Sequence, residues 1–182
     1  MRAWLGENDG VKLVSADGAS VDLRPVCYEY EQEPAADSAG EGEPVWDANW
    51  LVIRGQVRAA DGREWTFRDP CLTTWEAERL LEWLQALGCG EVRKALAFTE
   101  PNLGFRVDAQ DDERVRLRVH FSAESLPPGL RTPDARTPDA RTPGRRTAGY
   151  DVPLDVGRAD LADAARTWAV DCQAFPLRGP GS

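Results

Sequence analysis

Most of the first two-thirds of the chain alternates apolar with polar residues, which is the period of a β-strand with one buried face. The alternation is imperfect near the N-terminus, where Arg24-Pro25 interrupts it, and it becomes more regular further on. The segments that show it are 21–30, 45–54, 64–68, 96–99, 103–109, 114–121 and 152–156. We predict that these segments are strands and that a sheet is the main element of the fold.

One pair of these segments carries a hairpin signal. The segment 45–54 loses its alternation and becomes apolar throughout from Trp50 to Ile53. Such a run is typical of a central strand that is covered on both faces. Asp61-Gly62 follows, and this dipeptide favours a tight turn between paired strands. Because alternation resumes beyond the turn, we expect an antiparallel hairpin over residues 50–68.

Two segments have the 3.6-residue period of amphipathic helices. Thr73, with Glu76 three residues later, forms a capping-box sequence, and Gly88 suits the C-terminal end of the same helix. A second helix is predicted from about Arg158 to Gln173. The apolar positions of the two helices are Ala77, Leu80, Leu81, Leu84, Leu87, Leu161, Ala165, Trp168 and Cys172.

Strands grouped together, with one helix in the middle and one at the end, indicate an α+β fold. We expect a mainly antiparallel sheet with the two helices packed on one face. A chain of 182 residues is one domain by size. The unit Arg-Thr-Pro-Asp-Ala repeats within 131–146, and its prolines and small residues give a core nothing to bury. We therefore expect one domain, 1–182, with a disordered insert at 131–146.

The chain is acidic, and the insert hides part of that charge. The sequence holds 22 Lys and Arg against 31 Asp and Glu, a net charge of −9. The insert contributes five Arg and two Asp, so the remaining 17 basic and 29 acidic residues carry −12. This balance disfavours direct nucleic-acid binding and favours a basic partner. The absence of an export signal and of a membrane-length apolar run predicts a cytoplasmic protein that does not bind membranes.

Residues suited to catalysis or metal binding are sparse. The cysteines at positions 27, 71, 89 and 172 include no C-x-x-C pair, and His120 is the single histidine. Zinc is therefore not expected. The sequence also lacks the glycine-rich motifs that bind nucleotide phosphates. We expect no catalytic residue, no metal and no cofactor.

One predicted strand carries a row of cations. Arg114, Arg116 and Arg118 alternate with apolar residues, and His120 continues the row. Such a row could bind phosphate, or it could pair with acids on neighbouring strands. The acidity of the chain favours the pairing. The polar strand face favours an exposed sheet histidine over a general base at His120.

Two segments, 46–50 and 67–75, are richer in aromatic and polar residues than a plain sheet requires. Core packing accounts for many tryptophans, and Asp or Asn can simply serve a turn. The alternative is a rigid surface of carboxylates and aromatic anchors that grips a basic partner. The residues that we expect to bind a partner lie on the connections that flank the apolar strands, and they are Asp47, Asn49, Asp69, Glu100 and Asn102.

Three stretches, WDANWLVIRGQV, WTFRDPCLTTWEAERLLEWL and LAFTEPNLGFRV, resemble the wall-associated-protein immunity (WapI) family of small bacterial proteins. The similar part spans about 20–128, and the terminal helix with Trp168 also fits. The insert and an acidic loop at 31–44 depart from the family pattern. The resemblance implies an immunity protein that binds and neutralises a secreted polymorphic toxin. The toxin of the named system is a tRNA-cleaving nuclease.

The sequence thus predicts a monomeric, cytoplasmic immunity protein that is not an enzyme. It would bind the C-terminal domain of its cognate toxin, a basic nuclease, by stoichiometric contact. Two other classes stay open at this point. One is a small enzyme or ligand-binding module with a pocket between sheet and helix. The other is an acidic structural or regulatory partner that has no toxin.

Overall fold

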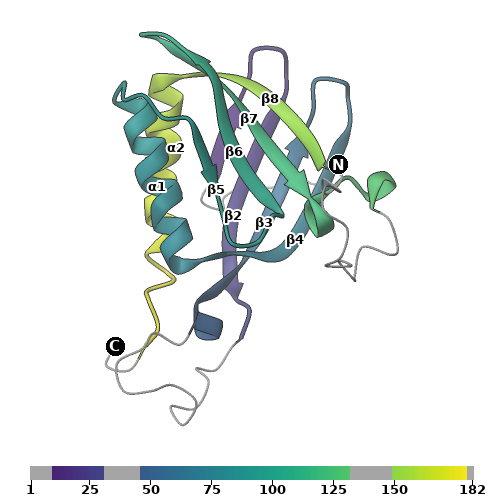
Figure 1. Cartoon of the computed structure of the whole chain (residues 1–182), viewed down its shortest axis with the longest axis vertical. Coiled ribbons are helices and arrows are strands. Elements are labelled where there is room, and N and C mark those ends of the chain that lie inside the picture. The colour runs from purple at the N-terminus through teal and green to yellow at the C-terminus, as the bar shows by residue number, and fades with distance from the viewer. Residues whose placement is uncertain (1–9, 31–45, 132–148, 180–182) are drawn as a thin grey trace, which may run out of the picture.

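The computed structural model describes residues 10–30, 46–131 and 149–179. The acidic loop at 31–44 and all but the first residue of the 131–146 insert lie outside the described residues. Within them the chain forms strands, two α-helices and short 3-10 helices. Figure 1 shows the strands as two layers, with both α-helices on the same side of the molecule.

The strands come in two groups along the chain, separated by the first helix. Their bounds are β1 Val11–Val14, β2 Ser20–Tyr28, β3 Trp50–Arg58, β4 Glu64–Thr73, β5 Ala95–Ala97, β6 Leu103–Gln110, β7 Arg114–Ser122 and β8 Gly149–Gly157. The helices are α1 Thr74–Gly88 and α2 Arg158–Cys172, and the 3-10 helices are η2 Trp46–Asn49, η3 Ala123–Ser125 and η4 Pro128–Leu130.

The strands form two four-stranded sheets, each in chain order. Sheet A has the order β1-β2-β3-β4, and sheet B has the order β5-β6-β7-β8. Every pairing of neighbouring strands is antiparallel. The expected α+β class is confirmed. The sequence suggested one sheet, whereas the structure divides the strands between two sheets that share a single core.

Aromatic side chains join the two sheets. Trp65 and Phe67 on β4 each meet Phe121 on β7 edge to face, with ring centroids 5.4 and 5.8 Å apart. The buried Trp65 indole N–H donates to the backbone carbonyl of Ser125, at 2.9 Å. A buried aromatic ring contributes a large apolar area, and edge-to-face pairs add to it. These contacts fix sheet A against sheet B.

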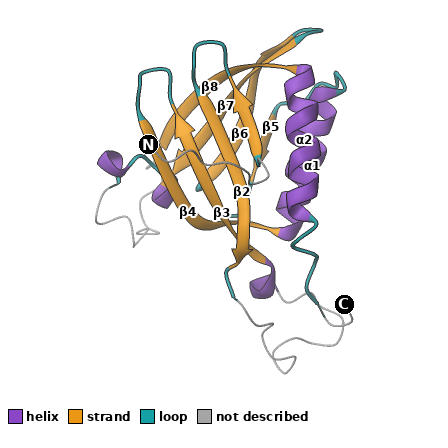
Figure 2. Ribbon diagram, turned by 180° about the vertical axis from the view of Figure 1, so that it is seen from behind, coloured by secondary structure: helices purple, strands orange, loops and turns teal. Residues whose placement is uncertain are grey.

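The two helices lie side by side along one edge of the sheets (Figures 1 and 2). The expected capping box opens α1, because the Thr73 side chain accepts from the Glu76 amide and the Glu76 carboxylate accepts from the Thr73 amide. Trp168 of α2 is fully buried, and its indole N–H donates to the carbonyl of Ala77 in α1, at 2.8 Å. The pair of helices is therefore tied together through one buried tryptophan.

Three local details differ from the sequence prediction. Residues Trp46–Asn49 form η2 and not the start of a strand. β3 is an interior strand of sheet A as expected, but its outward side chains, such as Val52, are only half-buried because nothing among the described elements packs over them. The short strand β1 was not predicted, since four residues give too little alternation to recognise.

The hairpin β3–β4 depends on a glycine. Gly55 is directly opposite Phe67, and a Cβ added at Gly55 would collide with the Phe67 ring. The ring therefore lies over the glycine and reaches Phe121 of the other sheet. A side chain at position 55 would displace the contact that joins the two layers.

We predict that Gly55→Ala lowers the free energy of unfolding by about 1–3 kcal/mol, the usual cost of overpacking. Urea unfolding measures it. The exposed Gly129 has no heavy atom within 4 Å of an added Cβ, so Gly129→Ala should stay within about 0.5 kcal/mol of wild type. A second change, Phe67→Leu, should cost less in the Gly55→Ala background than in wild type. Equal effects of the two glycine substitutions would contradict this explanation.

Candidate functional site

Five carboxylates from five separate segments influence one another at one end of the two sheets. They come from the residue after β2, from η2, from β4, from the turn between β5 and β6, and from η3. We call this group the carboxylate end, and its members are Glu29, Asp47, Asp69, Glu100 and Glu124. Within the described part of the chain, none of the five forms a salt bridge.

Repulsion within this group contributes to a raised pKa at two of its members, Glu29 and Asp69. Burial raises the pKa of Glu29 first, and the charges of Asp47 and Glu100 raise it further. The pKa of Asp69 is raised to about 6, chiefly by burial and then by Glu124, Glu100 and Glu29, while a hydrogen bond opposes the shift. Like charges held close together disfavour ionisation. A cation placed here would relieve that repulsion.

Asp69 owes its position to the pleat of β4. It continues the inward-facing series of Trp65 and Phe67 and lies opposite Ile53, but it is only half-buried, whereas Cys71, Leu72 and Thr73 further along β4 are buried. Its carboxylate accepts a hydrogen bond from the side-chain amide of Asn102. Asn102 is itself buried, with 5% of its surface exposed. The pair links β4 of sheet A to the turn that leads into β6 of sheet B.

Backbone contacts hold this end rigidly. The carbonyl of Asn102 accepts from the Ser122 amide at 3.1 Å, and the buried Ser125 hydroxyl lies within hydrogen-bonding distance of the same carbonyl. Between these serines, Ala123 adopts a left-handed conformation with φ of 50°, which non-glycine residues rarely adopt. This uncommon backbone conformation sets the direction in which the chain enters η3. Glu124 of η3 thereby lies beside the turn that carries Glu100.

Asn49 holds the C-terminal segment against the rest of the fold. Its side chain is fully buried. The amide nitrogen donates to the Arg178 carbonyl at 2.7 Å, and the Arg178 backbone N–H donates to the amide oxygen at 2.8 Å. The Arg178 guanidinium covers the Tyr28 ring at 3.4 Å, and the Tyr28 hydroxyl donates to the Pro176 carbonyl. Figure 2 shows the chain after α2 running toward the end where η2 lies.

The structure therefore brings the predicted residues to one end but gives them unequal exposure. Asp47 and Glu100 are exposed, Asp69 is half-buried, and Asn49 and Asn102 are buried. A buried side chain has no surface for direct contact with a partner. Any effect of Asn49 or Asn102 on binding would act through the segments that they hold. That these five residues form a partner-binding surface stays a prediction.

Glu29 and Glu124 join the group although the sequence analysis did not single them out. Neither residue lies in a motif, and each is close to the other carboxylates only through the sheet pairing and the turn contacts of the fold. The signal available in the sequence was weak: Glu29 lies between two tyrosines, Tyr28 and Tyr30, where a strand ends. An aromatic–acid–aromatic triplet at a strand end is a hint and no more.

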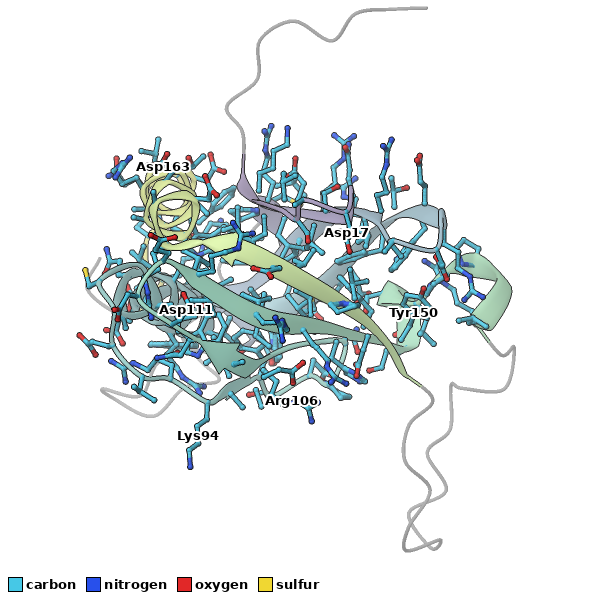
Figure 3. The ribbon with its side chains drawn as sticks, turned by 90° about the horizontal axis from the view of Figure 1, so that it is seen from above. Asp17, Lys94, Arg106, Asp111, Tyr150 and Asp163 are labelled. Atoms are coloured by element: carbon cyan, nitrogen blue, oxygen red, sulfur yellow. The ribbon has the colours of Figure 1, made fainter. Side chains whose placement is uncertain are left out.

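Arg114, Arg118 and His120 of the cation row on β7 contact acids, as the sequence analysis favoured for the row, and the described salt bridges include none to Arg116. Arg114 contacts Asp155 on β8 at 2.6 Å, and Arg118 contacts Asp108 on β6 at 2.5 Å. His120 meets Asp151 on β8 at 2.7 Å and is a partly exposed sheet histidine. These side chains point away from the core on the outward face of sheet B. Figure 3 shows Arg106 projecting on that same side.

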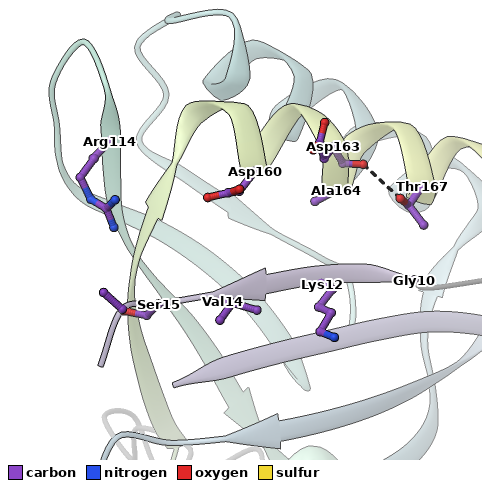
Figure 4. A pocket seen from close by; sticks show the side chains of 10 residues that line it. Gly10, Lys12, Val14, Ser15, Arg114, Asp160, Asp163, Ala164 and Thr167 are labelled. Carbon is purple, nitrogen blue, oxygen red and sulfur yellow. Dashed lines mark hydrogen bonds between the residues drawn. The ribbon is translucent and has the colours of Figure 1, made fainter. Parts of the chain in front are cut away.

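A cleft of about 490 Å³ lies between β1 and α2 (Figure 4). It is the place that a ligand-binding module with a pocket between sheet and helix would use. Its residues include Lys12 and Arg114 facing Asp160 and Asp163. Arg114 is already held by Asp155, and Ser15 accepts from the Asp155 amide at 3.2 Å. Much of the polar lining thus serves the fold, and the cleft offers a ligand few convergent groups.

Other chemical features are limited in the described part of the chain. All four cysteines are free thiols, and burial raises the pKa of the Cys71 thiol well above its usual range. Among the described residues, no three His, Cys, Asp or Glu side chains are grouped so that they could bind a metal ion. No described helix has the length and apolar character that crossing a membrane requires.

Comparison with known proteins places the chain in a family. It matches the immunity protein WapI-like family over residues 12–176, which is nearly its whole length. The chain belongs to this family, and the resemblance inferred from its sequence is confirmed. Membership assigns it a role in immunity and supports a function by binding. No curated protein and no solved structure shows significant similarity to it.

Asn49→Ala should lower the free energy of unfolding by about 1–3 kcal/mol, because it removes a buried side chain and leaves the part-buried backbone N–H and C=O of Arg178 without these partners. Chemical denaturation followed by tryptophan fluorescence measures the change. Asp47→Ala, in the same 3-10 helix but exposed, is the matched control and should stay within about 0.5 kcal/mol. If Asn49→Ala unfolds like wild type, the buried amide does not hold the C-terminal segment.

Asp69 should make the protein less stable as pH rises. Its pKa is about 6 in the folded chain and about 3.8 without the fold, so between these values the folded state binds the extra proton. The stability that this proton supplies is lost as pH rises from about 4 to about 6. Asp69→Asn, which keeps an acceptor for Asn102, should gain stability over wild type across that range and keep the gain at pH 7.

Urea midpoints measured from pH 4 to pH 7 test this prediction. Asp112→Asn, in the exposed turn between β6 and β7, removes the same charge away from the Asp69 site and is the matched control. An advantage of Asp69→Asn that is the same at every pH would mean that the carboxyl does not titrate within this range.

Proposed function

We propose that the chain neutralises a toxin by binding it stoichiometrically, and that the carboxylate end is the surface that binds. The family supports a toxin as the partner. The observation that supports the surface is the convergence of five carboxylates without a described counter-ion. Repulsion within such a group destabilises the folded chain when no partner is bound. A cationic partner removes that cost, and this favours the complex.

The partner that fits is the C-terminal domain of the cognate toxin, with a basic nuclease active site. A nuclease must attract phosphates, so its cleft is positive. Carboxylates presented at the spacing of a rigid surface can occupy the places that phosphates would take. Long-range attraction raises the association rate, and desolvated charge pairs then slow dissociation.

Rigid display makes the surface effective. The Asp69–Asn102 pair, the serine contacts to the Asn102 backbone and the left-handed Ala123 fix three of the five segments before any partner arrives. A surface that is already ordered loses little conformational entropy on binding. More of the energy of the contacts then appears as affinity, because less of it offsets the ordering of the surface.

This function requires no chemistry from the chain itself. We propose that it acts as a monomer in the cytoplasm and is not an enzyme. In that compartment a nuclease toxin would meet its nucleic-acid substrate, and a blocking protein must be present before it does. His120 fits this account, because its pairing with Asp151 on an outward sheet face is explained by sheet electrostatics.

We predict that the double variant Asp47→Asn/Glu100→Gln binds the toxin domain at least tenfold more weakly, about 1.4 kcal/mol. Most of the loss should appear in the association rate, and it should shrink at high salt, where charges beyond about 10 Å are screened. Binding kinetics by surface plasmon resonance with the purified toxin domain, together with survival of cells that express the toxin, measure this.

The control is Glu78→Gln/Glu82→Gln, which removes the same charge from the exposed side of α1. It should change affinity by less than about twofold. Both double variants should unfold at or above the wild-type denaturant concentration, because each loses like-charge neighbours. Equal losses of affinity in the two would show that net charge matters and the carboxylate end does not.

A further inference from the structure

Two large apolar side chains are exposed where the C-terminal segment meets the end of β2. Tyr30 lies two residues beyond that strand and is 50% exposed, and Leu177 is 48% exposed. Exposed apolar side chains that stand singly are common on protein surfaces and need no explanation. These two are different, because the fold brings them from distant parts of the chain to one place.

The residues on either side of Leu177 are both tied to the end of β2. Before it, the Pro176 carbonyl accepts a hydrogen bond from the Tyr28 hydroxyl. After it, the Arg178 guanidinium donates to the Tyr30 carbonyl at 2.8 Å. Leu177 is therefore held close to Tyr30. We call these two residues, Tyr30 and Leu177, the apolar pair.

Further contacts order the backbone that displays the apolar pair. The Phe175 ring meets the Tyr28 ring edge to face, with centroids 5.5 Å apart, and the Arg178 guanidinium covers the same tyrosine at 3.4 Å. The Asn49 side chain binds both backbone groups of Arg178. Side chains on an ordered backbone lose little conformational entropy when a partner binds, and a tyrosine ring is itself rigid.

The apolar pair adjoins the carboxylate end. Glu29 directly precedes Tyr30 in the chain. Asp47 lies in η2, the same 3-10 helix whose Asn49 holds the segment that carries Leu177. Burial, and then the charge of Asp47, raise the pKa of Glu29, so these two carboxylates lie near one another. Two members of the carboxylate end are thus neighbours of the apolar pair.

Carboxylates alone explain the formation of a complex better than its lifetime. Complementary charge speeds association and selects the partner, but charged groups must lose their water before they pair, and this offsets much of the attraction. The affinity of most protein interfaces is concentrated in a few side chains that pack in dry pockets, surrounded by polar residues. An apolar pair beside carboxylates has this arrangement.

We propose that Tyr30 and Leu177 are the apolar anchor of the toxin-binding surface, an inference that rests on the proposed function. The toxin domain that fits has an apolar depression beside its cationic cleft. The apolar pair fills the depression, while Glu29 and Asp47 meet the cations. The carboxylates then govern association, and the apolar pair governs dissociation. A basic nuclease that lacks the depression is released quickly, and this gives the chain specificity among nucleases.

The test measures the binding kinetics of the full chain with the purified toxin domain. Tyr30→Ser/Leu177→Ser should bind at least about tenfold more weakly, and most of the loss should appear as faster dissociation. The factor should be the same at low and at high salt, because the lost contacts are uncharged. Tyr30→Phe/Leu177→Met keeps the apolar volume and should stay within about twofold of wild type.

The control is Val14→Ser/Val92→Ser, which removes two exposed apolar side chains from the other end of the molecule. Val14 pairs with Ser20 at the start of β2, and Val92 follows the C-terminal end of α1. This variant should change affinity by less than about twofold. The serine variant of the apolar pair should unfold at the same urea concentration as wild type. A clear drop would show that the pair serves the fold and would contradict the proposal.

Comparison with Asp47→Asn/Glu100→Gln separates this inference from the function on which it rests. A loss of affinity in the carboxylate variant but not in the serine variant overturns the anchor and leaves the proposed function standing. A loss in the serine variant alone supports the anchor and overturns the carboxylate end as the binding surface. Equal losses in the serine variant and its valine control, or a loss confined to association, also overturn the anchor. No binding by wild type would overturn both.

Discussion

The arrangement of the two sheets depends on the contact between their inward aromatic faces. Trp65 and Phe67 of sheet A close on Phe121 of sheet B, and Gly55 leaves the space that lets the Phe67 ring lie there. Because this interior is filled by apolar side chains, most polar side chains of the two sheets lie on the outward faces and at the ends of the layers. The carboxylate end, which we assign to the toxin, lies at one of those ends.

Polar groups that reach into the interior are held in fixed positions by hydrogen bonds there. In the middle of β4 the inward-facing series reaches Asp69, whose carboxylate is half-buried and held by Asn102. Glu76 shows the same principle in α1, since its buried carboxylate caps the helix and accepts from both the backbone and the hydroxyl of Thr99. Thr99 and Asn102 lie on either side of Glu100 in the short connection between β5 and β6. Buried polar contacts thus hold an exposed charge in place.

Strand register also decides which charged side chains become neighbours. On sheet B, Arg114 contacts Asp155 and Arg118 contacts Asp108, each across neighbouring strands. On sheet A, Arg58 contacts Glu64 across the β3–β4 pair in the same way. Ion pairs of this kind on an exposed sheet face contribute little to stability.

Much of the fold could be predicted from the sequence, because alternation and capping are local signals. The capping box at Thr73, the Asp61-Gly62 turn and the strands from 103 to 121 are all present. The division into two sheets could not be predicted, since a period of two shows that one face is buried and not what covers it. Asn49 gave no sign of its role, because its partner Arg178 is 129 residues away in the chain.

The same limit applies to the candidate site. Asp47, Asp69 and Glu100 were recognised as displayed polar groups near apolar strands, while Glu29 and Glu124 gain meaning only when the fold brings them beside the others. The same holds for Arg24, Arg54 and Arg68, which are neighbours only through strand register. Sequence patterns report faces of single elements, and binding surfaces are built across elements.

Hydrogen–deuterium exchange of the chain, alone and in complex with the toxin domain, locates the contact without any substitution. If the carboxylate end binds the toxin, the complex should slow exchange at residues 29–30, 47–49, 99–102 and 122–126, and leave the outward face of sheet B unchanged. Slower exchange confined to sheet B and α2, with these four segments unaffected, would contradict the account.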